Sequence, residues 1–188
     1  FREDSREELQ SDLDFTAAVF GKAVNGFMNE NLRELRKVLT AVEEKKIHLK
    51  QVKRVGTLGV TQLDHDIAVE KGLYYYQGND FASEIIFSIR RLAEPMKDHI
   101  DNNFSPLSPV QKDDFGKVSE QIISFLRNCA IMIRKNDYIG FEELIAESIT
   151  LMNQLTALKK GELKRIQGQS GSTKVSMVTA ASTPSVAP

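Results

Sequence analysis

The chain contains few of the residues that mark disulfide-bonded, membrane-spanning or nucleic-acid-binding proteins. It has no tryptophan and a single cysteine, Cys129, so an intramolecular disulfide is excluded and a reducing compartment is expected. The most apolar window, 122–133, is interrupted by Arg127 and Asn128 and is shorter than the roughly 18 residues of a membrane span. The 25 basic and 26 acidic residues nearly balance, which gives no reason to expect a nucleic-acid partner.

Sequence signatures of common enzymes are also missing. There is no glycine-rich phosphate-binding loop, no Gly-x-Ser-x-Gly motif and no zinc-protease helix. Cys129 falls at an inward position of an expected helix, where a buried and unreactive thiol is more common than a nucleophile. The sequence therefore predicts a protein that is not an enzyme.

Apolar residues recur every three or four positions over most of the chain, which is typical of amphipathic helices. We expect an all-α, antiparallel bundle of about five to six long helices. The central helix is predicted over 80–103, after a turn at Gly78 and Asn79. Its inward face is predicted to contain Phe81, Ile85, Ile89, Leu92, Met96 and Ile100.

Glycines and the C-terminal stripe give further expectations. Gly56 and Gly59 are costly in a helix interior, but the apolar spacing continues beyond them, so the second helix is predicted to pass or kink there. The last helix is predicted to reach about Ile166. Its inward face is expected to contain Phe141, Leu144, Ile145, Ile149, Met152, Leu155 and Leu158.

The clearest linker lies at 102–109, which contains asparagine, serine and proline. Ser108, Pro109 and Gln111 have the pattern of a capping box that starts the next helix. From Gly168 onward, small and polar residues dominate and no apolar stripe remains, so 168–188 is predicted to be a flexible tail. The chain also begins with Phe1 rather than Met, and we expect it to derive from a longer protein.

Three pairs of acidic residues are candidate metal ligands, because residues four apart share one face of a helix. Oxygen-rich pairs brought together from several helices can hold hard or borderline cations. The alternative is that each pair lies on the solvated surface, where most Asp and Glu residues are found. The pairs are Glu94 with Asp98, Asp66 with Glu70, and Glu143 with Glu147.

Histidines offer a weaker indication of a metal. His65 lies between two aspartates, and His99 follows Asp98, so either could join carboxylates around iron or zinc. No Glu-x-x-His pair is present, which argues against a di-iron carboxylate site.

One segment resembles a known family. The residues from Tyr74 to Asn103, followed by Ser-Pro-Leu-Ser-Pro-Val-Gln, are similar to the cytosolic PhoU-like domain of PiT-type inorganic phosphate transporters, particularly in Bacteroidetes. The matching residues are Glu94, Pro95, His99, Ile100, Asp101, Asn102, Asn103, Pro106, Leu107, Ser108 and Gln111.

The resemblance implies a fold and a domain division. PhoU-like domains are two repeats of a spectrin-like three-helix unit, so residues 1–167 would form one such domain, with pseudo-repeats at about 5–103 and 109–167. The family's Glu/Asp-x-x-x-Asp signature binds iron or zinc in some members. Glu94 to Asp98 fits it, whereas the pairs ending in Glu70 and Glu147 fit loosely.

The implied function is a non-catalytic regulatory or accessory role in phosphate transport, at the cytoplasmic face of the inner membrane. The implied partner is the membrane-embedded part of a transporter or another transport or signalling protein, and a homodimer is also open. Two alternatives remain: a free-standing iron- or zinc-binding bundle or ferritin-like oxidase, and a structural dimerisation bundle.

Overall fold

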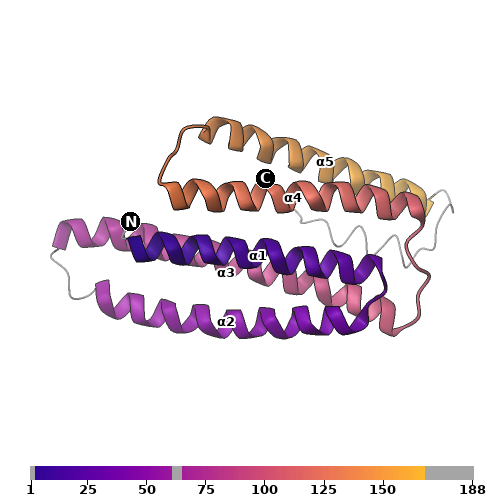
Figure 1. Ribbon diagram of the computed structural model, residues 1–188, viewed down its shortest axis with the longest axis horizontal. Coiled ribbons are helices and arrows are strands. Elements are labelled where there is room, and N and C mark those ends of the chain that lie inside the picture. Colours follow the sequence, from indigo (N-terminus) through magenta and orange to yellow (C-terminus); the bar gives the residue numbers. More distant parts are fainter. Residues whose placement is uncertain (1–2, 61–64, 168–188) are drawn as a thin grey trace.

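The computed structural model describes the backbone of residues 3–60 and 65–167 and the side chains of residues 6–52, 76–165 and 167. The described part is a bundle of five long helices, which reverse direction from one to the next (Figure 1). It contains no strand, so the predicted all-α class is confirmed. The helices are α1 (Glu3–Met28), α2 (Leu32–Val60), α3 (His65–Asp101), α4 (Pro109–Lys135) and α5 (Phe141–Gln167).

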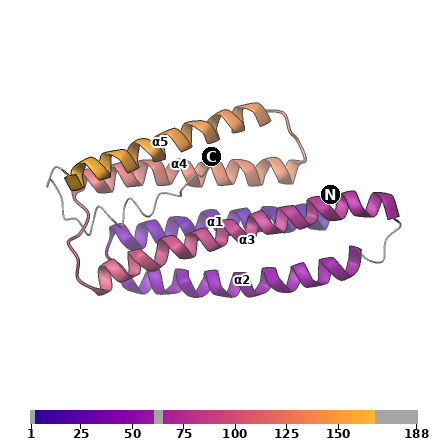
Figure 2. The ribbon, with the colours of Figure 1, turned by 180° about the vertical axis from the view of Figure 1, so that it is seen from behind.

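Helix α1 lies at the centre of the bundle. It packs on α2, α3 and α4, and α2 also packs closely on α3. Helix α5 lies at the edge and packs on α4 (Figures 1 and 2). None of the helices in the described ranges carries an apolar stretch long enough to cross a bilayer.

The principal core joins α1, α2 and α3 to the start of α4. Large side chains such as Leu35, Ile86 and Met96 are almost fully buried there, and Phe115 brings α4 into the same cluster. Among the described residues, α5 contributes no member to this cluster; its buried apolar residue, Leu151, faces α4 outside it. The core therefore stabilises four helices directly and α5 only through α4.

The predicted turn at Gly78 and Asn79 is wrong, because α3 is continuous from His65 to Asp101. Leu9 of α1 lies close to Gly78, and Asn79 is buried, with its carbonyl accepting a hydrogen bond from the Ser83 hydroxyl at 2.8 Å. A glycine costs a helix about 1 kcal/mol relative to alanine, which burial against a neighbouring helix can offset. Helix α2 likewise passes Gly56 and Gly59 and ends at Val60.

The predicted inward face of α3 was partly wrong. Ile89 and Met96 are buried as expected, but Phe81 is 68% exposed. Ala82, Ile86 and Ala93, which lie between the predicted positions, are also buried. Small residues at such positions let helix axes approach closely, and hydrophobicity alone does not reveal this preference.

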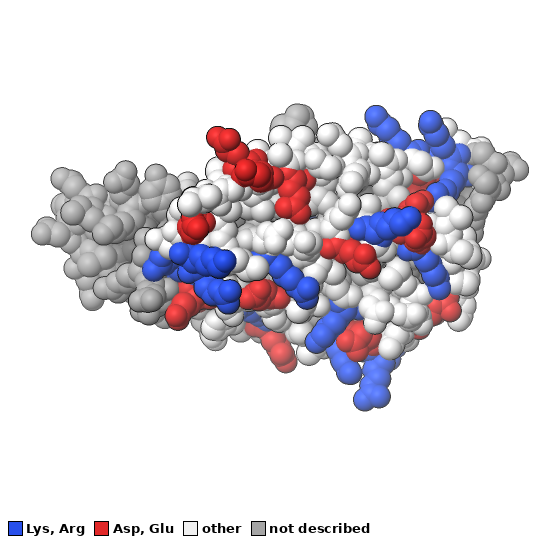
Figure 3. Space-filling model, turned by 45° about the horizontal axis from the view of Figure 1, so that its top comes forward, with Lys and Arg blue, Asp and Glu red and all other residues white. Residues whose placement is uncertain are grey.

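The predicted inward face of α5 was also wrong for four residues. Phe141, Ile145, Ile149 and Met152 are between 41% and 54% exposed. Within the described residues, α5 packs on α4, so it buries one face, and the apolar residues on its other face are exposed. Figure 3 shows this side of the molecule, where an uncharged area lies between acidic and basic side chains.

Candidate functional site

Glu94 belongs to an ion cluster between α3 and α2. Its Oε1 accepts a hydrogen bond from Arg90 Nε at 2.8 Å, and Arg90 Nη1 lies 3.0 Å from Glu43 Oε2 on α2. The hydrogen bond to Glu94, followed by its negative charge, raises the pKa of the Arg90 guanidinium. Glu94 therefore already has a cation partner in this structure.

Asp98 lies one turn further along α3, in a second ion cluster. Lys97 Nζ is 3.2 Å from Asp98 Oδ1 and 2.6 Å from Asp101 Oδ2. Asp101 also lies 3.5 Å from Arg36 on α2. The hydrogen bond from Lys97 lowers the pKa of Asp101, which is consistent with an ionised carboxylate serving a salt bridge.

The predicted pair Glu143 and Glu147 lies far from these clusters in the bundle, on the helix at its edge. Glu143 and Glu147 are on α5, which packs on α4, so the structure does not bring them together with Glu94 and Asp98. Glu147 lies near the thiol of Cys129 on α4. Burial, and then the Glu147 charge, raise the pKa of that thiol, so both favour its neutral form.

The remaining predicted pair, Asp66 and Glu70, lies near the start of α3. Asp66 and Glu70 are in its first turns, and their side chains, like that of His65, are outside the described ones. Among the described side chains, no group of three or more His, Cys, Asp and Glu residues could hold a metal ion. The six-residue iron or zinc site stays a prediction, and its four described members form two separate pairs.

The residues of the family-like segment form the junction between α3 and α4. His99 is buried, and its Nε2 lies 2.9 Å from the carbonyl oxygen of Ser105. Because a carbonyl oxygen can only accept, Nε2 donates the proton. The imidazole packs edge-to-face against Phe27 of α1 and Phe104 of the linker, each with ring centroids 5.4 Å apart. His99 therefore fixes the path of the linker against α1.

The predicted capping box completes this junction. The Ser108 hydroxyl accepts a hydrogen bond from Gln111 N at 3.3 Å, and Gln111 Oε1 accepts one from Ser108 N at 3.0 Å. These bonds satisfy backbone donors that the first turn of a helix leaves free. The linker predicted at 102–109 thus contains two fixed points: Ser105, whose carbonyl binds His99 of α3, and Ser108.

Gln111 also connects the junction to α5, a contact that sequence reasoning missed. Its Nε2 donates to Glu162 Oε2 at 3.1 Å, and Arg165 contacts the other oxygen of Glu162 while binding Asp114 at 2.8 Å. Glu162 is completely buried. It lies four residues after Leu158 on the same side of the helix, so the helical period alone could have indicated that it faces inward.

A second missed feature is the buried ion pair between Asp12 of α1 and Lys45 of α2. Asp12 is 1% exposed, and its backbone carbonyl accepts a hydrogen bond from the Thr16 hydroxyl. Its neighbour Leu13 is also buried, and the amphipathic pattern of the first helix points both toward the core.

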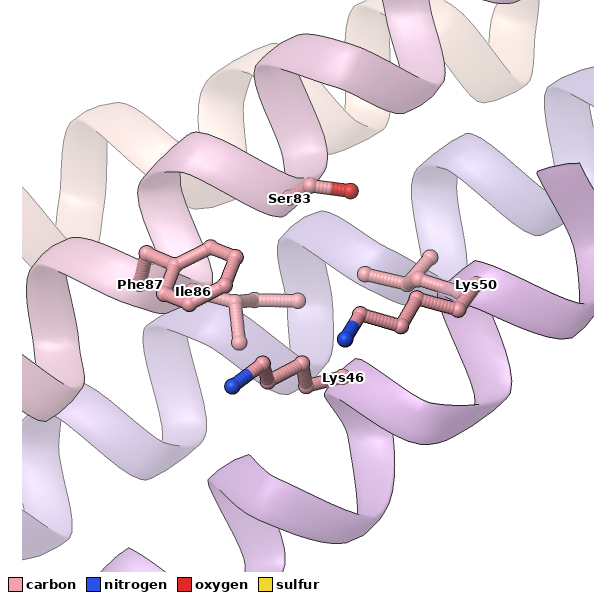
Figure 4. A pocket seen from close by; sticks show the side chains of 6 residues that line it. Lys46, Lys50, Ser83, Ile86 and Phe87 are labelled. Atoms are coloured by element: carbon pink, nitrogen blue, oxygen red, sulfur yellow. The ribbon is translucent and has the colours of Figure 1, made fainter.

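A small hollow lies between α2 and α3 (Figure 4). Its volume of about 30 Å³ has room for water and none for an organic cofactor. Lys46 and Lys50 reach into it from α2, and Ser83, Ile86 and Phe87 line it from α3. Lys46 Nζ lies 4.7 Å from the centre of the Phe87 ring, which is a cation–π contact. The hollow is therefore a small gap between the packed side chains of α2 and α3.

The described helices thus contain a junction between α3 and α4 and polar contacts between α1 and α2, between α2 and α3, and between α4 and α5. No protein-family model, curated protein or solved structure matches the chain at a significant level.

Proposed function

We propose that this chain is a non-catalytic regulatory or accessory domain of inorganic phosphate transport. It would act at the cytoplasmic face of the inner membrane, against a membrane-embedded transporter or a transport or signalling protein. The observation that carries the proposal is the segment from Glu94 to Gln111, which resembles the PhoU-like domains of phosphate transporters. In this structure the same segment forms the α3–α4 junction.

The arrangement of helices is compatible with this role. Helices α1, α2 and α3 pack on one another as a three-helix unit, and α4 and α5 follow as a second group attached mainly through α1. The PhoU-like family is built from three-helix units. The tail predicted at 168–188 follows this second group and lies outside the described residues.

A regulatory mechanism follows from the contacts at the junction. His99 ties the linker to α1, and Phe115 of α4 packs edge-to-face on Phe27 of α1, with ring centroids 6.3 Å apart. A partner that binds one group of helices therefore also constrains the other. Such a domain biases a transporter when its contacts with the open and closed states differ in free energy.

Phosphate uptake by cells tests the proposal directly. We expect deletion of the gene region encoding 1–188 to change the rate of labelled phosphate uptake, or its response to external phosphate, by at least about fivefold, the lower range of allosteric coupling. Uptake that is unchanged at both low and high external phosphate would contradict the proposal.

A junction variant provides a sharper comparison. His99→Ala removes the contact with Ser105 and the packing on Phe27, and we expect it to alter uptake in the same direction as the deletion. The matched control is His48→Ala, which removes an exposed histidine of α2. Circular dichroism of both purified variants establishes that each remains helical, so a change in uptake does not merely report unfolding.

A further inference from the structure

Exposed large apolar side chains are concentrated on α5 and the turn before it in the described part of the chain. Eight of the twelve exposed large apolar side chains there lie between Ile131 and Leu163, and most belong to α5 or to the turn before it. Single exposed apolar residues are common, but a contiguous group marks an interaction surface. The eight are Ile131, Tyr138, Ile139, Phe141, Ile145, Ile149, Met152 and Leu163.

Four of the five α5 members of this group, Ile145, Ile149, Met152 and Leu163, share one stripe. Together with Thr156 and Lys159, they follow one another at steps of four, three, four, three and four residues. This is the spacing of the a and d positions in a coiled coil, where two helices bury a narrow seam. Leu151, Leu155 and Leu158 occupy a different side and face α4, so α5 has two apolar faces and uses one of them.

The charges on α5 indicate which partner binds the apolar face that does not pack on α4. The first turns carry Glu142, Glu143 and Glu147, whereas Lys159, Lys160 and Lys164 lie near its end. Figure 3 shows these two ends as red and blue areas separated by white surface. A second α5 placed antiparallel puts the acidic end of each copy against the basic end of the other, whereas a parallel arrangement opposes like charges.

We propose that this face of α5 binds the same face of a second copy of the chain, forming an antiparallel two-fold symmetric pair. With the symmetry axis between Ile149 and Met152, Ile149 of one copy packs on Met152 of the other. The same register places Glu142 opposite Lys159, and symmetry repeats this pair at the other end. A two-fold interface uses the same patch on both copies, as this stripe requires. The inference is independent of the role in phosphate transport.

The test measures the association of the full 188-residue chain by sedimentation equilibrium. We expect a dimer in the wild type and, for Ile149→Lys, a dissociation constant at least about tenfold higher, because a charge would enter the centre of the seam. The matched control is Ile47→Lys on α2, where an isoleucine of similar exposure, 51% against 54%, lies outside the stripe. This control should leave the dissociation constant unchanged.

Charge reversal tests the orientation and the register. We expect Glu142→Lys and Lys159→Glu each to weaken the dimer by at least about threefold. The double variant should restore the wild-type constant to within about threefold. Both positions are exposed, so each variant retains its fold, which circular dichroism verifies.

Three outcomes would overturn the inference. The first is a wild type that is monomeric up to about 100 µM, roughly a hundredfold above a micromolar constant. The second is a dimer that Ile149→Lys leaves intact, which would place the interface elsewhere. The third is a double charge reversal that is no tighter than either single reversal.

Discussion

Glu162 is a buried carboxylate that two neighbouring side chains contact. It is completely buried between α4 and α5, where Gln111 donates to one carboxylate oxygen and Arg165 contacts the other. A buried charge is tolerated when it is paired and hydrogen-bonded, and removing one member leaves the others unsatisfied.

We therefore expect Glu162→Ala to lower the free energy of unfolding by about 1 to 3 kcal/mol, measured by urea denaturation. The control is Glu120→Ala on α4, which removes an exposed glutamate and should change stability by less than about 0.5 kcal/mol. Equal effects of the two substitutions would show that the buried network contributes nothing to stability.

Cys129 yields a prediction about pH. Burial and the nearby Glu147 carboxylate both raise its pKa, so the reactive thiolate is scarcer at a given pH than in a free cysteine. Alkylation by iodoacetamide should thus be slower than for a model thiol, and its midpoint should lie at higher pH. Glu147→Gln removes the negative charge and should shift that midpoint to lower pH. A midpoint that is unchanged in this variant would contradict the assigned electrostatic cause.

At the scale of a single helix, two glycines differ in the space beside them. Replacing each with alanine distinguishes the effect of backbone freedom on stability from the effect of packing. A Cβ added at Gly161 of α5 would meet nothing within 4 Å, whereas one at Gly26 of α1 would lie 3.3 Å from Leu35 Cγ. Alanine restricts the unfolded chain more than glycine and favours the helix by about 1 kcal/mol.

We expect Gly161→Ala to raise the free energy of unfolding by about 0.5 to 1 kcal/mol in thermal or chemical denaturation. Gly26→Ala should show a smaller gain or a loss, because the new methyl group would press on the buried Leu35 side chain. If Gly26→Ala stabilises the protein more than Gly161→Ala, local packing does not decide these effects.

At the scale of the whole molecule, the helices differ in how many neighbours hold them. Helix α1 packs on three helices and supplies much of the core, whereas α5 packs on α4 alone in the described part. Regions with few buried apolar contacts open at lower free energy than the core.

Hydrogen exchange should therefore show this order. At low protein concentration, amides of α5 should be protected at least about tenfold less than those of α1. Protection of α5 should rise with protein concentration if α5 forms the proposed interface, while that of α1 should not follow it. Equal protection of the two helices in dilute solution would contradict the order of stability inferred from the packing.

Several features could be predicted from local sequence because their causes are local. The capping box at Ser108 and Gln111 depends on residues three positions apart, and the structure contains it as expected. The turn at Gly78 was wrong for the opposite reason: glycine weakens an isolated helix, but packing against α1 holds this one together. Likewise, the pair Glu94 and Asp98 could be recognised by its spacing, whereas the contacts that this part of α3 makes with Glu43 and Arg36 of α2 could not.

The sequence by itself determined that the described chain would be helical, because apolar residues at a period near 3.6 can be buried together only on a helix. Only the tertiary structure decided which apolar stripe faces which neighbour. Hydrophobic spacing states that a face must be covered and does not state by what, so Phe141, Ile145, Ile149 and Met152 appeared inward in the sequence and are exposed in the folded chain. Their exposure depends on α5 packing on α4 alone among the described helices, and this arrangement is set by the tertiary structure.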